Sequence, residues 1–463
     1  MSDIVIFYEL PERELNNANL LKAEFERRGY TVEIKDYYNY HEIISPIKEK
    51  PKLVIAQSGY DNSDLERFTL RFKNKIDKML NMRYEQVISK RVLNSSLHYP
   101  RGYMKNMCHI CWSEYIKEEM IKEGIHEENL IVTGDIKTDF SNEKFDSFYK
   151  TKEELAEEFD LDKDKDWILF ISSFTFNEDV DDKRLMRLNN NLEDGKYLQK
   201  WDCESKEILL EWIEKFVKNN PDKEFIYRPH PAEHNTLSED TRVSDLEKKY
   251  SNFNYINAYA IQEWIRPCEY LNTITSTSII DVYLQNKQCN ILRPVPLNPD
   301  FDNPLLVNAD YITSYDDFEY YNTVGTNNKF PVPQEDVDKY YYFGDKLVYE
   351  NICDFAEKMI KEDKYEADFY PDDSKFSRLR FAIKKSLSMP KLVPKILKSI
   401  FSNKSASSKT ESNDSKYVEN EEKIFKIIKV EYSQKTLIEL VLIMFLVQHL
   451  EYQEQDLHLH NQI

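Results

Sequence analysis

The strongest constraint on the fold is a regular alternation of short apolar segments with longer amphipathic ones. Ile4–Tyr8 predicts a buried strand, and Leu15–Arg28 predicts an amphipathic helix that Gly29 ends. Tyr30–Ile34 then predicts the next strand. Strands that alternate with helices form parallel sheets, because each helix returns the chain across the sheet to start the next strand. The sequence therefore predicts an α/β protein.

The alternation occurs in two series that are separated by the charged segment Asp160–Asp166. The first series adds strands at Lys52–Ala56, Gln86–Ile88, Ile110–Trp112 and Leu130–Thr133, and helices at Leu65–Leu80, Glu114–Lys122 and Lys152–Phe159. The second predicts strands at Trp167–Ser172, 224–227, 254–257, 272–275 and Asn290–Leu292, and helices at Lys206–Asn219 and 278–286. A helix at Leu347–Lys361 is expected to cross back to the first domain. We expect two Rossmann-like parallel-sheet domains, 1–160 and 161–370, that face each other across a cleft, and a partly disordered tail, 371–463.

Glycine usage excludes two common kinds of nucleotide site. The chain has 8 glycines in 463 residues and contains neither GxGxxG nor GxxxxGK[ST]. Dinucleotide dehydrogenases and P-loop NTPases are therefore excluded, and a phosphate must be held by side chains and helix N-termini. The net charge of −20 argues against a nucleic-acid partner, because it repels a phosphate backbone.

Cysteine usage and the opening residues predict a cytoplasmic protein. Six cysteines are scattered along the chain, and the opening segment lacks a basic, signal-like stretch. No apolar run reaches the ~18–20 residues that span a bilayer. Cys108 and Cys111 form a CxxC without a second metal-binding pair, so we interpret them as structural, in helix-like apolar surroundings. Asp179 and Asp181 form a DxD that we interpret as solvated charge, and no metal site is predicted.

Two motifs predict a phosphate site. Residues 224–231, Glu-Phe-Ile-Tyr-Arg-Pro-His-Pro, place Arg228 and His230 directly after a strand. Ser276, Thr277 and Ser278 follow another strand and open a helix. Each motif alone also fits a plain role, a turn or a helix cap. Together, at strand ends where α/β sheets bind ligands, they indicate a phosphorylated, nucleotide-activated ligand.

Further segments carry a family resemblance. Residues 7–17, Phe-Tyr-Glu-Leu-Pro-Glu-Arg-Glu-Leu-Asn-Asn, are similar to the N-terminus of surface-carbohydrate biosynthesis proteins. Val132–Asp139 resembles the Gly-x-x-Lys-x-Asp segment of Kdo-transferase-like enzymes, and Arg-Pro-His-Pro and Ser-Thr-Ser resemble their His-Pro and Ser-Ser motifs. Residues 1 to about 365 thus resemble GT-B glycosyltransferases of bacterial surface and capsular polysaccharide synthesis. That group includes Kdo-transferase-like, sialyltransferase-like and polyol-phosphate-transferase-like enzymes.

The resemblance implies a metal-independent glycosyltransferase without a cofactor. It would move a sugar from a nucleotide-activated donor to a cell-surface polysaccharide or lipid-linked glycan. Arg228 and His230 would hold the donor phosphate, and His230 would stabilise the charge that develops on it as the sugar–oxygen bond breaks. The other implied donor-binding residues are Lys137, Ser172, Ser173, Ser276, Thr277, Ser278 and Asp281. Asp281 would accept hydrogen bonds from ribose hydroxyls; alternatively, it only stabilises the N-terminus of its helix. Lys137 would bind the phosphate; alternatively, it is a solvated lysine in a loop.

The resemblance also places the acceptor in the N-terminal domain. The general base is then Glu9 or Glu85, and Arg13 would bind the acceptor's charge. The sequence leaves both carboxylates open, although Glu9 has the clearer strand-end position. Two other classes stay open as well: a nucleotide-sugar epimerase of GT-B fold and a non-catalytic carbohydrate-assembly scaffold.

The tail contains a basic segment in an otherwise acidic chain. Lys375–Lys404 carries nine Lys or Arg residues and no acid, interleaved with apolar residues, and the polar link Ser402–Asn420 follows. This pattern predicts attachment to anionic lipid at the inner face of the cell membrane, with a basic disordered tail as the alternative.

We expect the full chain to sediment with anionic vesicles at low salt and to be released at high salt. Each Lys or Arg near an anionic surface contributes about 1 kcal/mol, which salt screens. Truncation after Asp373 should abolish sedimentation in the same assay. Equal sedimentation of the full and truncated chains would contradict attachment through the tail.

Overall fold

The computed structural model describes residues 2–365, except 40, 45, 74–75, 95–97, 177–179, 190, 231–232, 234–240 and 326–329. Every element below lies within residues 2–365. Lys375–Lys404 and Asp179 lie outside the described residues, so the predictions for the tail and for the DxD stay predictions. Within the described part, no helix is long and apolar enough to cross a membrane.

The first sheet has six parallel strands in the order β2-β1-β3-β4-β5-β6. They are β1 Ile4–Tyr8, β2 Val32–Asp36, β3 Leu53–Ala56, β4 Met79–Asn81, β5 Cys108–Cys111 and β6 Leu130–Val132. The residues of β3 are all buried, as expected for a strand that helices cover on both faces.

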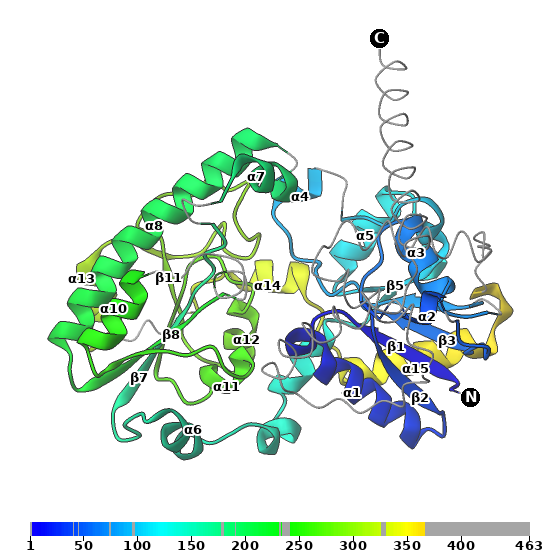
Figure 1. Ribbon diagram of the computed structural model, residues 1–463, viewed down its shortest axis with the longest axis horizontal. Coiled ribbons are helices and arrows are strands. Elements are labelled where there is room, and N and C mark those ends of the chain that lie inside the picture. Colours follow the sequence, from blue (N-terminus) through cyan, green and yellow to red (C-terminus); the bar gives the residue numbers. More distant parts are fainter. Residues whose placement is uncertain are drawn as a thin grey trace, which may run out of the picture. The chain divides into compact units, whose positions relative to one another are not determined.

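The second sheet also has six parallel strands, in the order β12-β11-β10-β7-β8-β9. They are β7 Asp166–Ile171, β8 Lys223–Arg228, β9 Phe253–Tyr255, β10 Tyr270–Thr273, β11 Asn290–Leu292 and β12 Tyr311–Ile312. The predicted fold class is confirmed: the chain has two Rossmann-like parallel sheets with helices, a GT-B-like fold (Figure 1).

Helices connect most of the strands. They are α1 Pro11–Arg27, α2 His41–Ile44, α3 Asn62–Thr69, α4 Lys90–Asn94, α5 Glu114–Lys122, α6 Lys152–Phe159, α7 Asp182–Asn189, α8 Leu192–Asn219, α10 Thr241–Lys249, α11 Ile261–Ile265, α12 Ile279–Leu284, α13 Tyr315–Tyr321, α14 Gln334–Tyr340 and α15 Val348–Lys361. Short 3-10 turns include η3, Ile136–Ser141. The start of α6 shows why local sequence predicted some bounds well: Thr151 and Glu154 form a reciprocal capping box.

Three sequence predictions about elements are wrong. The helix expected at Leu65–Leu80 ends at Thr69, and β4 occupies 79–81. Gln86–Ile88 is not a strand; the buried Gln86 amide instead donates to the carbonyl of Ile110, at 3.0 Å, and accepts from the N–H of Trp112. The surroundings of Cys108 and Cys111 are the strand β5 rather than helix-like. Both thiols are buried, which raises the pKa of each to about 12, as suits a structural role.

The predicted return of the last helix to the first sheet is confirmed. Helix α15, yellow in Figure 1, packs against α1 and β3. Arg28, at the end of α1, forms an ion pair with Asp354 of α15 at 2.7 Å. The carboxylate of Asp139, in η3, accepts the N–H groups of Val348 and Tyr349 at 2.8 and 2.7 Å. Asp139 therefore caps the N-terminus of α15 from a distant part of the chain.

We expect Asp139→Ala to lower the free energy of unfolding by about 1–3 kcal/mol, because two buried N–H groups lose their acceptor. Asp139→Asn retains one acceptor oxygen, so its loss should be smaller. Urea unfolding of the three proteins checks this order. Equal stability of the Ala variant and the wild type would show that the cap does not stabilise α15.

Candidate functional site

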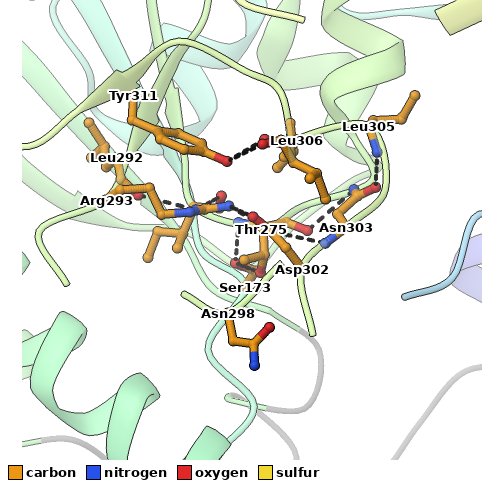
Figure 2. Close-up of polar contacts among 12 residues, drawn as sticks. Ser173, Thr275, Leu292, Arg293, Asn298, Asp302, Asn303, Leu305, Leu306 and Tyr311 are labelled. Atoms are coloured by element: carbon orange, nitrogen blue, oxygen red, sulfur yellow. Dashed lines mark hydrogen bonds and ion pairs between the residues drawn. The ribbon is translucent and has the colours of Figure 1, made fainter. Parts of the chain in front are cut away.

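The second sheet changes its direction of growth at β7. The chain adds β8 and β9 on one side of β7 and then returns to place β10 on the other. Ligands of open α/β sheets bind outside the carboxyl ends of the strands at such a switch point. Here Ser173 follows β7 and Thr275 follows β10, and their hydroxyls lie 2.8 Å apart (Figure 2). The backbone N–H of Thr275 also donates to Ser173 Oγ, at 3.1 Å. The structure thus joins hydroxyl groups from both sides of the switch.

The three hydroxyl residues after Thr275 form the entry to α12. Ser276 Oγ accepts the backbone N–H of Ser278 at 3.1 Å, and Thr277 is exposed. Helix α12 begins at Ile279 and has six residues, so it is shorter than the predicted 278–286. A helix this short has a small dipole, so anion binding here would depend on hydroxyl and backbone N–H groups.

A buried ion pair supports the loop that carries these hydroxyls. Arg293 Nη2 donates to both carboxylate oxygens of Asp302 at 2.8 Å, and both residues are buried (Figure 2). Arg293 also donates to the carbonyl oxygen of Ile274, and Asn303 Nδ2 donates to that of Thr275. Sequence reasoning missed this pair. Its signal was present, because Arg293-Pro294 repeats at the end of β11 the Arg-Pro that follows β8.

Arg228 is largely occupied by the neighbouring loop. Its Nη1 donates to Asn257 Oδ1 at 2.6 Å, and its Nη2 donates to the carbonyl oxygen of Tyr259 at 2.6 Å. Burial lowers its pKa to about 10. The Nε–H is buried and has no hydrogen-bond partner in the part of the chain that the structure describes. The Nε–H of Arg228 is therefore the donor that could still form a hydrogen bond with a ligand.

His230 lies where charges from both halves of the chain act on it. Burial lowers the pKa of His230 below its ordinary value, and the carboxylate of Glu233 opposes this shift. The charges of Arg13 and Glu85, from the first half, also act on its pKa, the first lowering it and the second raising it. The imidazole is therefore largely neutral at pH 7, and it lies within electrostatic reach of two other predicted site residues.

Glu233 is the centre of a buried network that the sequence did not predict. It accepts from Ser172 Oγ at 2.6 Å, from Lys206 Nζ at 2.8 Å and from Tyr227 Oη at 2.8 Å. Lys206 and Glu233 are both buried. Of the two predicted serines, Ser172 is buried in this network, whereas Ser173 is partly exposed.

Asp202, on α8, holds the loop after β7. Its Oδ2 accepts the N–H groups of Thr175 and Phe176, each at 3.0 Å. Burial raises the pKa of Asp202 to about 7, and these hydrogen bonds offset only part of that shift. Asp202 therefore shapes the loop that carries Ser173.

Of the residues predicted for the acceptor side, Glu9 directly follows β1, Arg13 lies in the first turn of α1, and Glu85 follows the last residue of β4 by four positions. Glu9 accepts a hydrogen bond from Tyr38 Oη. Glu85 forms an ion pair with Arg13 at 2.9 Å, with both side chains about half exposed. Sequence reasoning missed Glu14, which accepts the backbone N–H of Glu9 at 2.6 Å and whose pKa burial raises to about 7.

Lys137 and Asp281 are brought together, but in enclosed surroundings. Lys137 Nζ lies 3.6 Å from Asp135 Oδ2, and its charge lowers the pKa of Asp281. Burial nevertheless raises the pKa of Asp281 overall, and Gln262 Nε2 donates to its carboxylate at 2.9 Å. Asp281 is 1% exposed, so a ribose hydroxyl would reach it only after a rearrangement of its neighbours.

Comparison with known proteins gives structural likeness only. No family model matches the sequence, and no curated protein matches it. Among solved structures, the chain is similar to the wall teichoic acid polymerase TagF, with 12% identity over 78% of this chain and 89% of that one, at a TM-score of 0.47. It is also similar to the UDP-GlcNAc 2-epimerase from Methanocaldococcus jannaschii, with 14% identity, coverage of 77% and 99%, and a TM-score of 0.47. It is similar as well to the UDP-N-acetylglucosamine 2-epimerase from Rickettsia bellii, with 12% identity over 77% of this chain and 96% of that one, at a TM-score of 0.46. The fold is assigned from the strand order and register of the two sheets. Structural similarity with a TM-score below 0.5 does not strengthen that assignment.

We expect Asp202→Asn to flatten the dependence of stability on pH. The folded state retains a proton on Asp202 up to about pH 7, whereas the unfolded chain releases it near pH 3.8, so stability falls as pH rises between these values. One such proton gives a slope of at most about 1.4 kcal/mol per pH unit. The Asn oxygen can accept the same two N–H groups, which makes the variant a matched one. Unfolding in urea across this pH interval should show the smaller slope, and identical slopes would refute the assignment.

Proposed function

We propose that the chain is a metal-independent glycosyltransferase that takes a sugar from a nucleotide-activated donor. The observation that carries this proposal is the meeting of Ser173 and Thr275 at the switch point, with His230 following the adjacent strand β8. Hydroxyl groups, backbone N–H groups and a largely neutral imidazole at one sheet edge suit a phosphate-bearing ligand.

In this proposal the donor phosphate lies against residues 276–278. Their hydroxyl groups and the Nε–H of Arg228 donate to its oxygens. As the sugar–oxygen bond breaks, negative charge grows on the leaving phosphate, and a ring N–H of His230 stabilises it. The network around Glu233 and the bonds of Asp202 hold the β7 loop and the residues after β8, so the donors are oriented before the ligand arrives.

The acceptor hydroxyl is proposed to lie at the carboxyl edge of the first sheet, in a domain that spans 1–160, with the donor domain at 161–370. Glu9 is the better candidate for the base, because the carboxylate of Glu85 is already bonded to Arg13. Arg13 would bind acceptor charge only when that pair opens. The acceptor class is a cell-surface polysaccharide or a lipid-linked glycan, reached at the inner membrane face through the tail.

We expect one of CMP, CDP, UDP, GDP and ADP to raise the melting temperature of the protein, because binding to the folded state stabilises it by mass action. In the corresponding sugar-transfer assay, His230→Ala should abolish transfer and leave the melting temperature of the free protein nearly unchanged. Wild-type turnover in this variant would contradict the phosphate site.

The same assay separates the two carboxylates. Glu9→Gln should slow transfer by a factor on the order of 10²–10⁴ with donor binding preserved, and Glu85→Gln should have a smaller effect. If both variants transfer sugar at the wild-type rate, the base is neither Glu9 nor Glu85. If a UDP-sugar yielded only its epimer, the protein would be an epimerase, and if no nucleotide bound, a non-catalytic scaffold would be favoured.

A further inference from the structure

Arg83 is a buried cation without a carboxylate partner in the described part of the chain. Its residue is 2% exposed, and the groups whose charge acts on its pKa are Cys111, Tyr60 and Tyr99. Two other buried arginines are compensated: Arg71 is paired with Glu42 at 3.2 Å, and Arg293 is paired with Asp302. A buried charge is strongly unfavourable unless it is paired, so the surroundings of Arg83 call for an explanation.

The hydrogen bonds of Arg83 are few and weak. Nη1 lies 2.7 Å from Met120 Sδ, and Nη2 donates to the carbonyl oxygen of His98 at 3.4 Å. The Nε–H has no partner among the described residues. The backbone of Arg83 also has a φ of +50°, which is unfavourable for a residue with a side chain. Neither the charge nor the backbone conformation of Arg83 is explained by packing alone.

Other polar atoms without partners lie at the same edge of the first sheet. Gln57 directly follows β3, the strand that pairs with β4 through Ala56 and Asn81. Gln57 is 1% exposed, and neither its Oε1 nor its Nε2 has a hydrogen-bond partner within the described ranges. A buried amide without any partner is rare in proteins and commonly marks a missing water or ligand.

His98 and Tyr60 provide an approach to this edge. Both are partly exposed, and their rings meet edge to face with centroids 6.0 Å apart. His98 Nδ1 is buried and has no partner in the part of the chain that is described. Arg83 Nη2 lies 3.4 Å from the carbonyl oxygen of His98, so the two residues are neighbours. Burial lowers the pKa of His98, and the charge of Arg83 lowers it further.

We propose that Arg83, Gln57 and His98 form an anion-binding site at the carboxyl edge of the first sheet. Arg83 and Gln57 are 2% and 1% exposed, so the anion reaches them only after the partly exposed rings of His98 and Tyr60 move aside. Arg83 supplies the charge, and Gln57 and His98 supply hydrogen-bond donors. The ligand group is a phosphate or a carboxylate, since each is an anion that a guanidinium binds in a planar, two-bonded manner.

The site is tested on the full chain with inorganic phosphate at constant ionic strength, and with chloride as the reference anion. Phosphate should shift the ring resonances of His98 in a saturable manner and raise its pKa, because a bound anion favours the imidazolium form. Arg83→Met should weaken this binding at least about tenfold, as expected for loss of a charged hydrogen-bond donor. The same variant should melt at or above the wild-type temperature, because it removes a buried charge that has no carboxylate partner among the described residues.

Arg71→Met is the matched control, since Arg71 is equally buried but is paired with Glu42. It should melt at a lower temperature and leave the phosphate response of His98 intact. If Arg83→Met fails to fold, Gln57→Leu tests the same site and should also weaken phosphate binding. An unchanged His98 spectrum in phosphate, or a destabilised Arg83→Met that still binds phosphate, would overturn the proposal.

Two further probes show which anionic groups the site accepts. Glycerol phosphate should displace inorganic phosphate at His98, and glucuronate should displace it if the site also binds carboxylates; failure of glycerol phosphate to compete would overturn a phosphate site. Stabilisation by a nucleotide should persist in Arg83→Met. If phosphate binds at His98 but no nucleotide binds anywhere, the proposed function fails and the anion site stands.

Discussion

The second half of the chain depends on the central position of β7. This strand pairs with β8 on one side and with β10 on the other, and its apolar residues from Trp167 to Phe170 are completely buried. Parallel strands on both sides force the following loops to one edge of the sheet. Ser173 and Thr275 meet for this reason, although they are 102 residues apart in sequence. The candidate site is therefore a direct consequence of strand order.

The buried charged residues of the structure differ in whether they form an ion pair. Arg293 with Asp302 and Lys206 with Glu233 are paired, and each pair holds a loop that carries predicted site residues. Removing one member of such a pair leaves the other uncompensated, which is strongly destabilising. Arg83 does not have this compensation in the described residues. The contrast distinguishes groups that position a loop from Arg83, which we propose binds an anion.

The sequence predicted regular elements well where local signals agree. Helix α5 and helix α6 have the predicted bounds, because a capping serine or threonine precedes each of them and apolar spacing continues through them. The prediction failed around β4, where apolar residues spaced among charged ones after α3 looked like a continued helix, whereas Met79–Asn81 forms a three-residue strand. Periodicity cannot separate a short buried strand from a buried helical segment. The two-residue strand β12 was also missed, because two residues are too few to show an alternation.

By itself, the sequence determined the fold class and the strand ends that carry Arg228, His230 and residues 276–278. It could do so because alternating strands and helices have local signatures, and because ligand sites follow from where strands end. Only the tertiary structure decided which side chains are available. It buried Ser172 against Glu233, paired Arg13 with Glu85 and enclosed Asp281. Among the described residues, it left Arg83 without a carboxylate partner. These outcomes depend on contacts between residues far apart in the chain, and no local pattern encodes such contacts.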